Sequence, residues 1–334
     1  MTTYKGINGF AVQSVASDPS PLDEGQVWYN NATYAFKLAG VTTVGTWAAG
    51  GNIGTARYAA GSAGTQTAAL GFGGYGPPLA PTSVATEEYD GTSWTAGGSL
   101  NTGRYALASA GTQTSALASG GGAVPGGASL SAVEKYDGTS WTSSTSLPGT
   151  RATSGGAGTQ TAALVFGGIT PPGATLLTSS FEFDGTSWSP GGTLNDNRGR
   201  GISGCGNQTA ALAFGGQGVG RSAATEEYDG TSWTTGGSLN TARSKISQNI
   251  GTQTSALAAG GQPGPANEIN LVEQYNGTSW TSVATLTTAR QAPIGGGDTS
   301  NGLVASGGGA AGYVSATEEW TGAGSPVTQT ITTS

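Results

Sequence analysis

Short apolar runs alternate with turn-forming residues along most of the chain. A run such as AALGFGG (68–74) is rich in Ala, Leu and Phe and ends in two glycines, and close variants return downstream. Asp-Gly and Asn-Gly pairs lie between these runs, and they are strong hairpin signals because the turn needs positive φ angles. Short apolar segments bounded by Gly-rich turns are typical of strands. The pattern therefore predicts an all-β protein.

These segments form an internal repeat, in which three motifs return in register at intervals of 45–48 residues. The first is a tryptophan, at Trp47, Trp94, Trp141, Trp188, Trp233 and Trp280. The second is the turn GTQT or GNQT, which begins at Gly64, Gly111, Gly158, Gly206 and Gly251. The third is a glycine that ends an apolar run, at Gly73, Gly120, Gly167, Gly215, Gly260 and Gly307.

Each repeat predicts four antiparallel strands, which we call a to d. Strand a follows an Arg, strand b is the apolar run, strand c ends at an Asp-Gly turn, and strand d carries the Trp. A four-stranded repeat of this length is one blade of a β-propeller. The sequence thus predicts a six-bladed β-propeller with four antiparallel strands per blade.

The chain resembles the kelch family at the glycine pair, the strand-c aromatic and the Trp, which in the second repeat are Gly120, Gly121, Tyr136 and Trp141. The resemblance covers roughly residues 43–320 and implies a propeller of the kind that most often serves as a binding scaffold, although galactose oxidase shares the fold. The motifs DGTSW and GTQTAAL resemble those of propellers encoded by phages and aquatic metagenomes.

The last repeat lacks a DGTSW motif after Trp320, so its strand d must come from elsewhere. We expect a strand near residues 42–47 to close this blade, because that removes an open sheet edge; residues 327–332 are the alternative. The domains are then an extension at 1–41, the propeller at 42–324 and a tail at 325–334. Within the extension, DEGQVWYNNATYAFKLAG resembles segments of phage tail and fibre proteins, which implies attachment to other virion proteins through residues 1–41.

An arginine precedes strand a in every repeat, and such a ring would suit a carboxylate or phosphate ligand. A buried charge is costly unless it is paired, and a Glu two residues before the strand-c aromatic offers a partner in five repeats. We therefore expect structural ion pairs, except in the third repeat, where Phe181 replaces the Glu and Arg151 or Arg198 is less fully paired. The arginines are Arg57, Arg104, Arg151, Arg198, Arg243 and Arg290.

The repeated tryptophans suit two roles, sugar stacking or packing between blades. Their identical placement favours packing, because Trp and Tyr supply much of the buried area in such cores. The single Cys205 excludes an internal disulfide and is expected to be a small buried hydrophobe.

Charge and residue types exclude several functions. A formal net charge of −7 leaves no positive field for nucleic acid. The chain has no run of about 20 apolar residues for a membrane span, and we expect no signal peptide. It has no histidine for a catalytic triad or a usual zinc site. The loop acids Asp196, Glu268 and Asp298 form no recognisable catalytic pair. We expect no enzymatic activity, metal or cofactor.

The loops between strands b and c differ among the repeats while the scaffold stays constant, as in a recognition surface; the alternative is neutral drift of solvated loops. Their candidate ligand-binding residues are Tyr75, Arg221, Asn267, Asn270 and Tyr313. We expect a structural or adhesive protein of a phage virion that binds a host-surface glycan or protein. The alternatives are an architectural decoration or filament-forming subunit, with homo-oligomers, and, more distantly, a carbohydrate-active enzyme.

Overall fold

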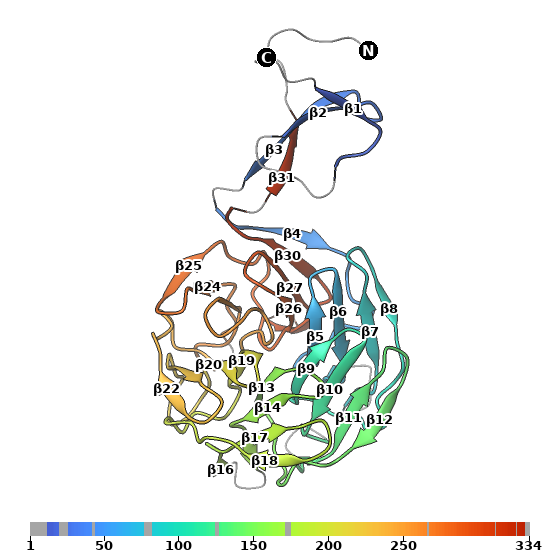
Figure 1. Cartoon of the computed structure of the whole chain (residues 1–334). Helices are drawn as coiled ribbons and strands as arrows, with labels where there is room; N and C mark the ends of the chain where they lie inside the picture. The colour runs from blue at the N-terminus through green and yellow to red at the C-terminus, as the bar shows by residue number, and fades with distance from the viewer. Residues whose placement is uncertain are drawn as a thin grey trace. The chain divides into compact units, whose positions relative to one another are not determined.

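The computed structural model describes residues 12–19, 26–41, 44–76, 82–123, 127–170, 175–265, 267–310, 312–324 and 326–330. All regular elements within these ranges are β-strands (Figure 1). The chain divides into two compact parts, a terminal part made of Met1–Thr46 and Thr321–Ser334, and a central part made of Trp47–Trp320.

The terminal part holds one sheet with the strand order β1-β2-β3-β31. Its strands are β1 (Gln13–Val15), β2 (Val27–Asn30), β3 (Ala35–Val41) and β31 (Pro326–Thr330). The sequence leaves residues 325–334 as a tail and offers 327–332 as an alternative closing strand. Both expectations need correction, because β31 pairs antiparallel with β3, where Ala39 lies opposite Thr328.

Among its described residues the central part holds six main antiparallel sheets, one for each repeat, and two small two-stranded sheets. The first repeat forms β5 (Gly61–Thr65), β6 (Ala68–Phe72), β7 (Thr86–Tyr89) and β8 (Trp94–Ala96). The second forms β9 (Ala108–Thr112), β10 (Ser115–Ser119), β11 (Val133–Tyr136) and β12 (Trp141–Ser144). The third forms β13 (Gly155–Gly158), β14 (Ala163–Phe166), β17 (Ser180–Phe183) and β18 (Trp188–Pro190). The fourth forms β19 (Ser203–Asn207), β20 (Ala210–Phe214), β21 (Thr225–Tyr228) and β22 (Trp233–Thr235).

The fifth and sixth sheets differ from the other four. The fifth has three strands, β23 (Ala256–Ala259), β24 (Val272–Tyr275) and β25 (Trp280–Val283). The sixth consists of β26 (Ile294–Gly297), β27 (Asn301–Ala305), β30 (Thr317–Thr321) and β4 (Thr46–Gly50). β4 lies beside β30 as the fourth strand, the place that the sequence assigns to a strand from the N-terminal region. Two b–c loops contain short hairpins, β15 (Ile169–Thr170) with β16 (Thr175–Leu176), and β28 (Gly308–Gly309) with β29 (Gly312–Tyr313).

The missing strand of the fifth sheet corrects the expectation of four strands in every repeat. Asn249 has a φ angle of 60° within the segment where the other repeats form strand a, and this conformation interrupts an extended strand. The Asn249 amide instead donates hydrogen bonds to the Ser62 and Ser109 hydroxyls of the first two repeats. Strand a of the first two repeats has Gly-Ser-Ala (61–63) and Ala-Ser-Ala (108–110), whereas the fifth repeat has the bulkier polar sequence Ser-Gln-Asn (247–249) in the same place.

Aromatic residues fill the space between neighbouring sheets. Trp141 lies 4.9 Å from Tyr136 of its own sheet and 4.7 Å from Phe72 of the preceding one, measured between ring centroids. Its indole N–H donates to the Thr86 hydroxyl, also in the preceding sheet. The Tyr136 hydroxyl likewise donates to Glu88 at 2.5 Å. The tryptophans therefore join adjacent sheets, as the repeat predicts.

A closed cycle of backbone hydrogen bonds joins the inner ends of the six repeats. One residue of each repeat donates its N–H to the carbonyl of the neighbouring repeat, at 2.6–3.2 Å, and all six residues have positive φ angles. In order of donation they are Ala59, Ala292, Lys245, Gly201, Thr153 and Ala106, which returns to Ala59. These all-β antiparallel sheets fit a β-propeller, with the a strands of five sheets, β5, β9, β13, β19 and β26, toward the middle (Figure 1).

Candidate functional site

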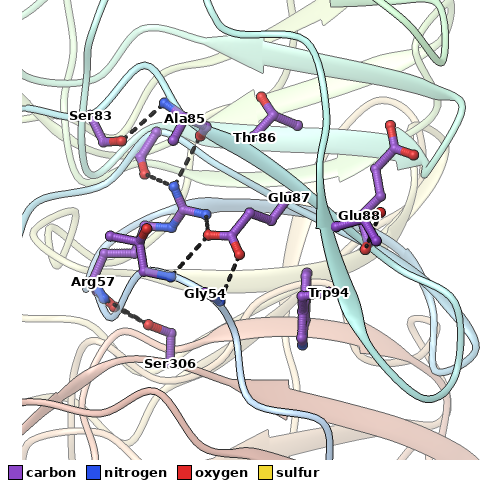
Figure 2. A network of polar contacts seen from close by, with 12 residues as sticks. Gly54, Arg57, Ser83, Ala85, Thr86, Glu87, Glu88, Trp94 and Ser306 are labelled. Carbon is purple, nitrogen blue, oxygen red and sulfur yellow. Dashed lines mark hydrogen bonds and ion pairs between the residues drawn. The ribbon is translucent and has the colours of Figure 1, made fainter.

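The repeated arginines are buried and paired. Arg57 contacts Glu87 at 2.7 Å, and the Glu87 carboxylate also accepts the Gly54 N–H at 2.7 Å (Figure 2). The same ion pair forms in four more repeats, between Arg104 and Glu134, Arg198 and Glu226, Arg243 and Glu273, and Arg290 and Glu318. Each guanidinium also donates to backbone carbonyls around it, as from Arg57 to Ala85. The guanidinium groups are thus bound within the scaffold, with only Nε of Arg57 and of Arg198, among these five, lacking a hydrogen-bond partner in the described residues, and they leave no cationic ring for a ligand.

The third repeat departs from this arrangement at two positions at once. Phe181 replaces the Glu, and its ring centroid lies 4.5 Å from the Arg151 guanidinium. Burial lowers the pKa of Arg151 to about 10. Pro148 stands where Asn101 of the second repeat donates its N–H to Glu134. The acceptor and the donor have therefore been lost together. Arg198, the other arginine expected to be less fully paired, contacts Glu226 at 2.9 Å.

A cavity of about 210 Å³ lies where the inner ends of the repeats meet. All six residues of the backbone hydrogen-bond cycle line it. Several lining side chains follow the repeated arginine by one or two residues and differ in size and charge. They are Tyr58, Tyr105 and Arg200, together with Thr153 and Lys245 of the cycle. A second hollow, of about 570 Å³, is lined mainly by the repeated turns around Gly64, Gly251 and Gly297.

Four tyrosines gather on one side of the cavity. Tyr58 and Tyr105 line it, and two tyrosines from the b–c loops pack beside them. The Tyr313 ring is stacked on Tyr58 with centroids 5.8 Å apart, and Tyr75 meets Tyr58 edge-on at 5.7 Å. Burial raises the pKa of Tyr58 and of Tyr313. The cluster offers apolar ring faces with hydroxyl groups at their edges.

Three cations gather in the fourth and fifth repeats, where Arg200 and Lys245 line the cavity. Lys245 Nζ donates to the Gln291 amide oxygen at 2.8 Å, and Arg221 donates to the amide oxygens of Gln217 and Gln262. Burial and the nearby Arg221 lower the pKa of Lys245. Burial and the nearby Arg200 likewise lower that of Arg221. These cations repel one another and are held by neutral groups.

Two buried polar atoms of cavity-lining residues have no hydrogen-bond partner among the described residues. They are the Gln248 amide oxygen Oε1 and the Thr153 hydroxyl oxygen Oγ1. Most buried polar atoms in proteins are hydrogen-bonded, so each such exception calls for an explanation.

The five predicted ligand residues divide between site and scaffold. Tyr75 and Tyr313 belong to the tyrosine cluster, and Arg221 to the cation cluster. Asn270 is a correction, because its side-chain amide donates to the Leu286 carbonyl and holds the backbone. Asn267 forms a β-bridge with Gly264 within its loop and is not among the residues that line the cavity.

Five residues that line the cavity were not predicted from the sequence: Tyr58, Tyr105, Arg200, Lys245 and Gln248. A signal was present in the sequence. The repeated Arg is followed by Tyr in the first and second repeats, and then by Ala, Gly, Ser and Gln. Variation directly beside an invariant residue marks a position that the scaffold does not constrain.

Three other residues considered in the sequence, Cys205, Asp298 and Glu268, are buried or hydrogen-bonded within the protein. Cys205 is buried, and burial raises its thiol pKa to about 12. Asp298 accepts two backbone N–H groups in a turn, and Glu268 accepts the Gln291 amide. Across the described ranges, no group of three or more Cys, Asp or Glu residues is placed to hold a metal ion. The described residues also include no helix long and apolar enough to cross a membrane.

Comparison with known proteins supports the fold alone. No protein-family model and no curated protein matches this sequence. Among solved structures, the one titled "Structure of YjhT" is similar to this chain, with a TM-score of 0.68 and 15% sequence identity. The similarity covers 84% of this chain and 99% of that one.

Proposed function

We propose that this protein is a six-bladed, kelch-like β-propeller that acts as a non-enzymatic recognition protein of a phage virion. It binds a host-surface glycan or protein at the axial cavity and the b–c loops beside it. Residues 1–41 attach it to other virion proteins. The six sheets and the six-membered hydrogen-bond cycle support the blade count. The tail-like DEGQVWYNN segment supports the virion context.

One observation carries the binding function, namely that the cavity is lined where the repeats differ. The position directly after the repeated Arg varies. It holds Tyr58 and Tyr105, which line the cavity, in two repeats, and small or polar residues in the others. Constant residues build the frame, and variable ones face an accessible hollow, which is the usual layout of a recognition surface.

The placement of the acids supports a role without catalysis. In five repeats one Glu of strand c neutralises the buried Arg, as Glu134 does for Arg104. The next acid on the strand accepts a Tyr hydroxyl from the adjacent sheet, as Glu88 does from Tyr136. Hydrolysis of a glycosidic bond generally needs two free carboxyl groups facing one cleft, and these acids are committed to the scaffold.

The test is a glycan array together with adsorption of the purified full-length chain to host cells. We expect binding, and we expect Tyr58→Ala with Tyr105→Ala to weaken it about 30-fold or more by removing the aromatic wall. Tyr34→Ala is the matched control, because Tyr34 is 81% exposed in the terminal part. Absence of binding by the intact chain would contradict the proposal. Ordered self-assembly without binding would favour a decoration or filament subunit, and glycan cleavage would favour an enzyme.

A further inference from the structure

The cavity combines three chemical features that a single class of ligand would satisfy. The first is an excess of positive charge on one side. Arg200, Arg221 and Lys245 lie within electrostatic reach of one another, and Glu268 is the one acid that raises the pKa of Lys245. In a chain with a net charge of −7, this local excess is the opposite of the average surface.

The amides that hold these cations do not neutralise them. Gln217 and Gln262 hold Arg221, while Gln291 bridges Lys245 to Glu268 at 2.8 and 2.7 Å. The Arg200 guanidinium forms no ion pair with any residue in the described ranges. A half-buried cation cluster that is oriented by neutral groups suits an anionic group of a ligand, which forms short, charge-assisted hydrogen bonds.

The second feature is the pair of unsatisfied atoms. The Gln248 amide oxygen is an acceptor only, so it requires a donor such as a ligand hydroxyl. The Thr153 hydroxyl donates or accepts, and a ligand hydroxyl suits it as well. A simple anion such as phosphate or a carboxylate side chain would leave the Gln248 acceptor unsatisfied, and leaving a buried acceptor unpaired is unfavourable.

The third feature is the wall formed by Tyr58 and Tyr105, with Tyr75 and Tyr313 packed behind Tyr58. Its ring faces suit the apolar C–H face of a sugar ring. A volume of about 210 Å³ lies below the range of roughly 300–1,000 Å³ typical of drug-sized pockets. The cavity therefore accommodates one compact residue rather than a long segment of chain.

We propose that the axial cavity binds a single acidic sugar residue at the end or side of a glycan. Its carboxylate or sulfate group contacts Arg200 and Lys245, its hydroxyls bond Gln248 and Thr153, and its ring lies on Tyr58 and Tyr105. This inference rests on the proposed function, since it names the class of glycan that the same cavity recognises.

The experiment uses the full-length chain on an array in which each uronic-acid-containing or sulfated glycan is paired with its neutral parent. We expect acidic members to bind about tenfold or more tightly than their parents, because hydrogen bonds to charged groups are the stronger kind. The uronate and sulfate arms distinguish the two sources of negative charge. Arg200→Gln should remove the preference, and Arg200→Lys should retain most of it.

Lys37→Gln is the matched control, because it removes one positive charge from β3 in the terminal part. Gln248→Met should weaken acidic and neutral glycans alike, since it removes an acceptor for a hydroxyl. Circular dichroism verifies that each variant is folded. Equal binding of acidic and neutral partners, or an unchanged preference in folded Arg200→Gln, overturns the acidic-sugar inference. The proposed function still stands in that case if Tyr58→Ala with Tyr105→Ala abolishes binding, and falls if the intact chain binds no glycan and no host cell.

Discussion

The repeated arginine and the residue that follows it in the chain behave in opposite ways. The arginine is the same in six repeats and is buried, and in five of them it forms an ion pair with a Glu, as Arg104 does with Glu134. The next residue varies among the repeats, and where it is tyrosine, as at Tyr58 and Tyr105, it lines the cavity. Adjacent positions in the chain thus separate the scaffold from the recognition surface.

The third repeat shows how strictly the scaffold position is constrained. When Glu is replaced by Phe181, the backbone donor is replaced by Pro148, and Arg151 keeps an aromatic ring as its partner. Loss of one group without the other would have left a buried polar atom unpaired. The variable position shows no such coupled change, which is what a surface free to adapt to a ligand requires.

The largest expected effect comes from breaking one buried ion pair. Glu134→Ala leaves Arg104 buried without its carboxylate, and we expect the free energy of unfolding to fall by about 3–5 kcal/mol. Chemical denaturation of the purified chain measures this loss. In contrast, Arg200→Gln at the cavity should change stability by no more than about 0.5 kcal/mol. Comparable losses in the two variants would contradict the separation of scaffold from recognition surface.

A smaller effect is expected from restoring the third repeat to the common pattern. Phe181→Glu alone supplies a carboxylate for Arg151, and Pro148→Asn alone supplies a backbone N–H without an acceptor. Together they rebuild the arrangement of the other repeats. We expect the free energy of unfolding of the double variant to exceed, by about 1 kcal/mol, the value obtained by adding the effects of the two single changes. Denaturation of the four proteins measures this coupling, and strict additivity would refute it.

The smallest effect concerns the exposed Asp-Gly turns. The Thr92 hydroxyl, with the N–H groups of Ser93 and Thr92, lowers the pKa of Asp90 from 3.8 to about 2. A carboxylate whose pKa is lowered by folding stabilises the folded state at pH values above its ordinary pKa. This contribution is lost as the pH falls toward 2. Asn276 accepts the same two backbone N–H groups in the fifth repeat without titrating. Asp90→Asn should therefore flatten the decline in unfolding free energy between about pH 4 and pH 2, and an unchanged decline would rule out this contribution.

Much of the scaffold follows from local patterns. The strand order within a repeat follows from the apolar run and the hairpin turn, and the Arg–Glu pairs follow from the cost of burying a charge. The exception at Phe181 is likewise visible in the sequence. The irregular fifth repeat was not predicted, because the left-handed conformation of Asn249 is stabilised by Ser62 and Ser109, which lie 187 and 140 residues away.

The sequence by itself determined the repeat, its strands and turns, and the pairing of its buried charges, because these depend on neighbours within one repeat or on one periodic register. Only the tertiary structure decided which variable residues come together. Tyr58, Tyr313, Arg200 and Lys245 belong to four repeats, yet they meet because the inner ends of all six repeats are joined in one hydrogen-bonded cycle. Contacts between distant segments arise from closure of the whole set of sheets, and no local pattern records them. Likewise, β31 found its partner in β3 rather than in the last repeat, because the antiparallel partner that completes a sheet is settled by its position in the fold.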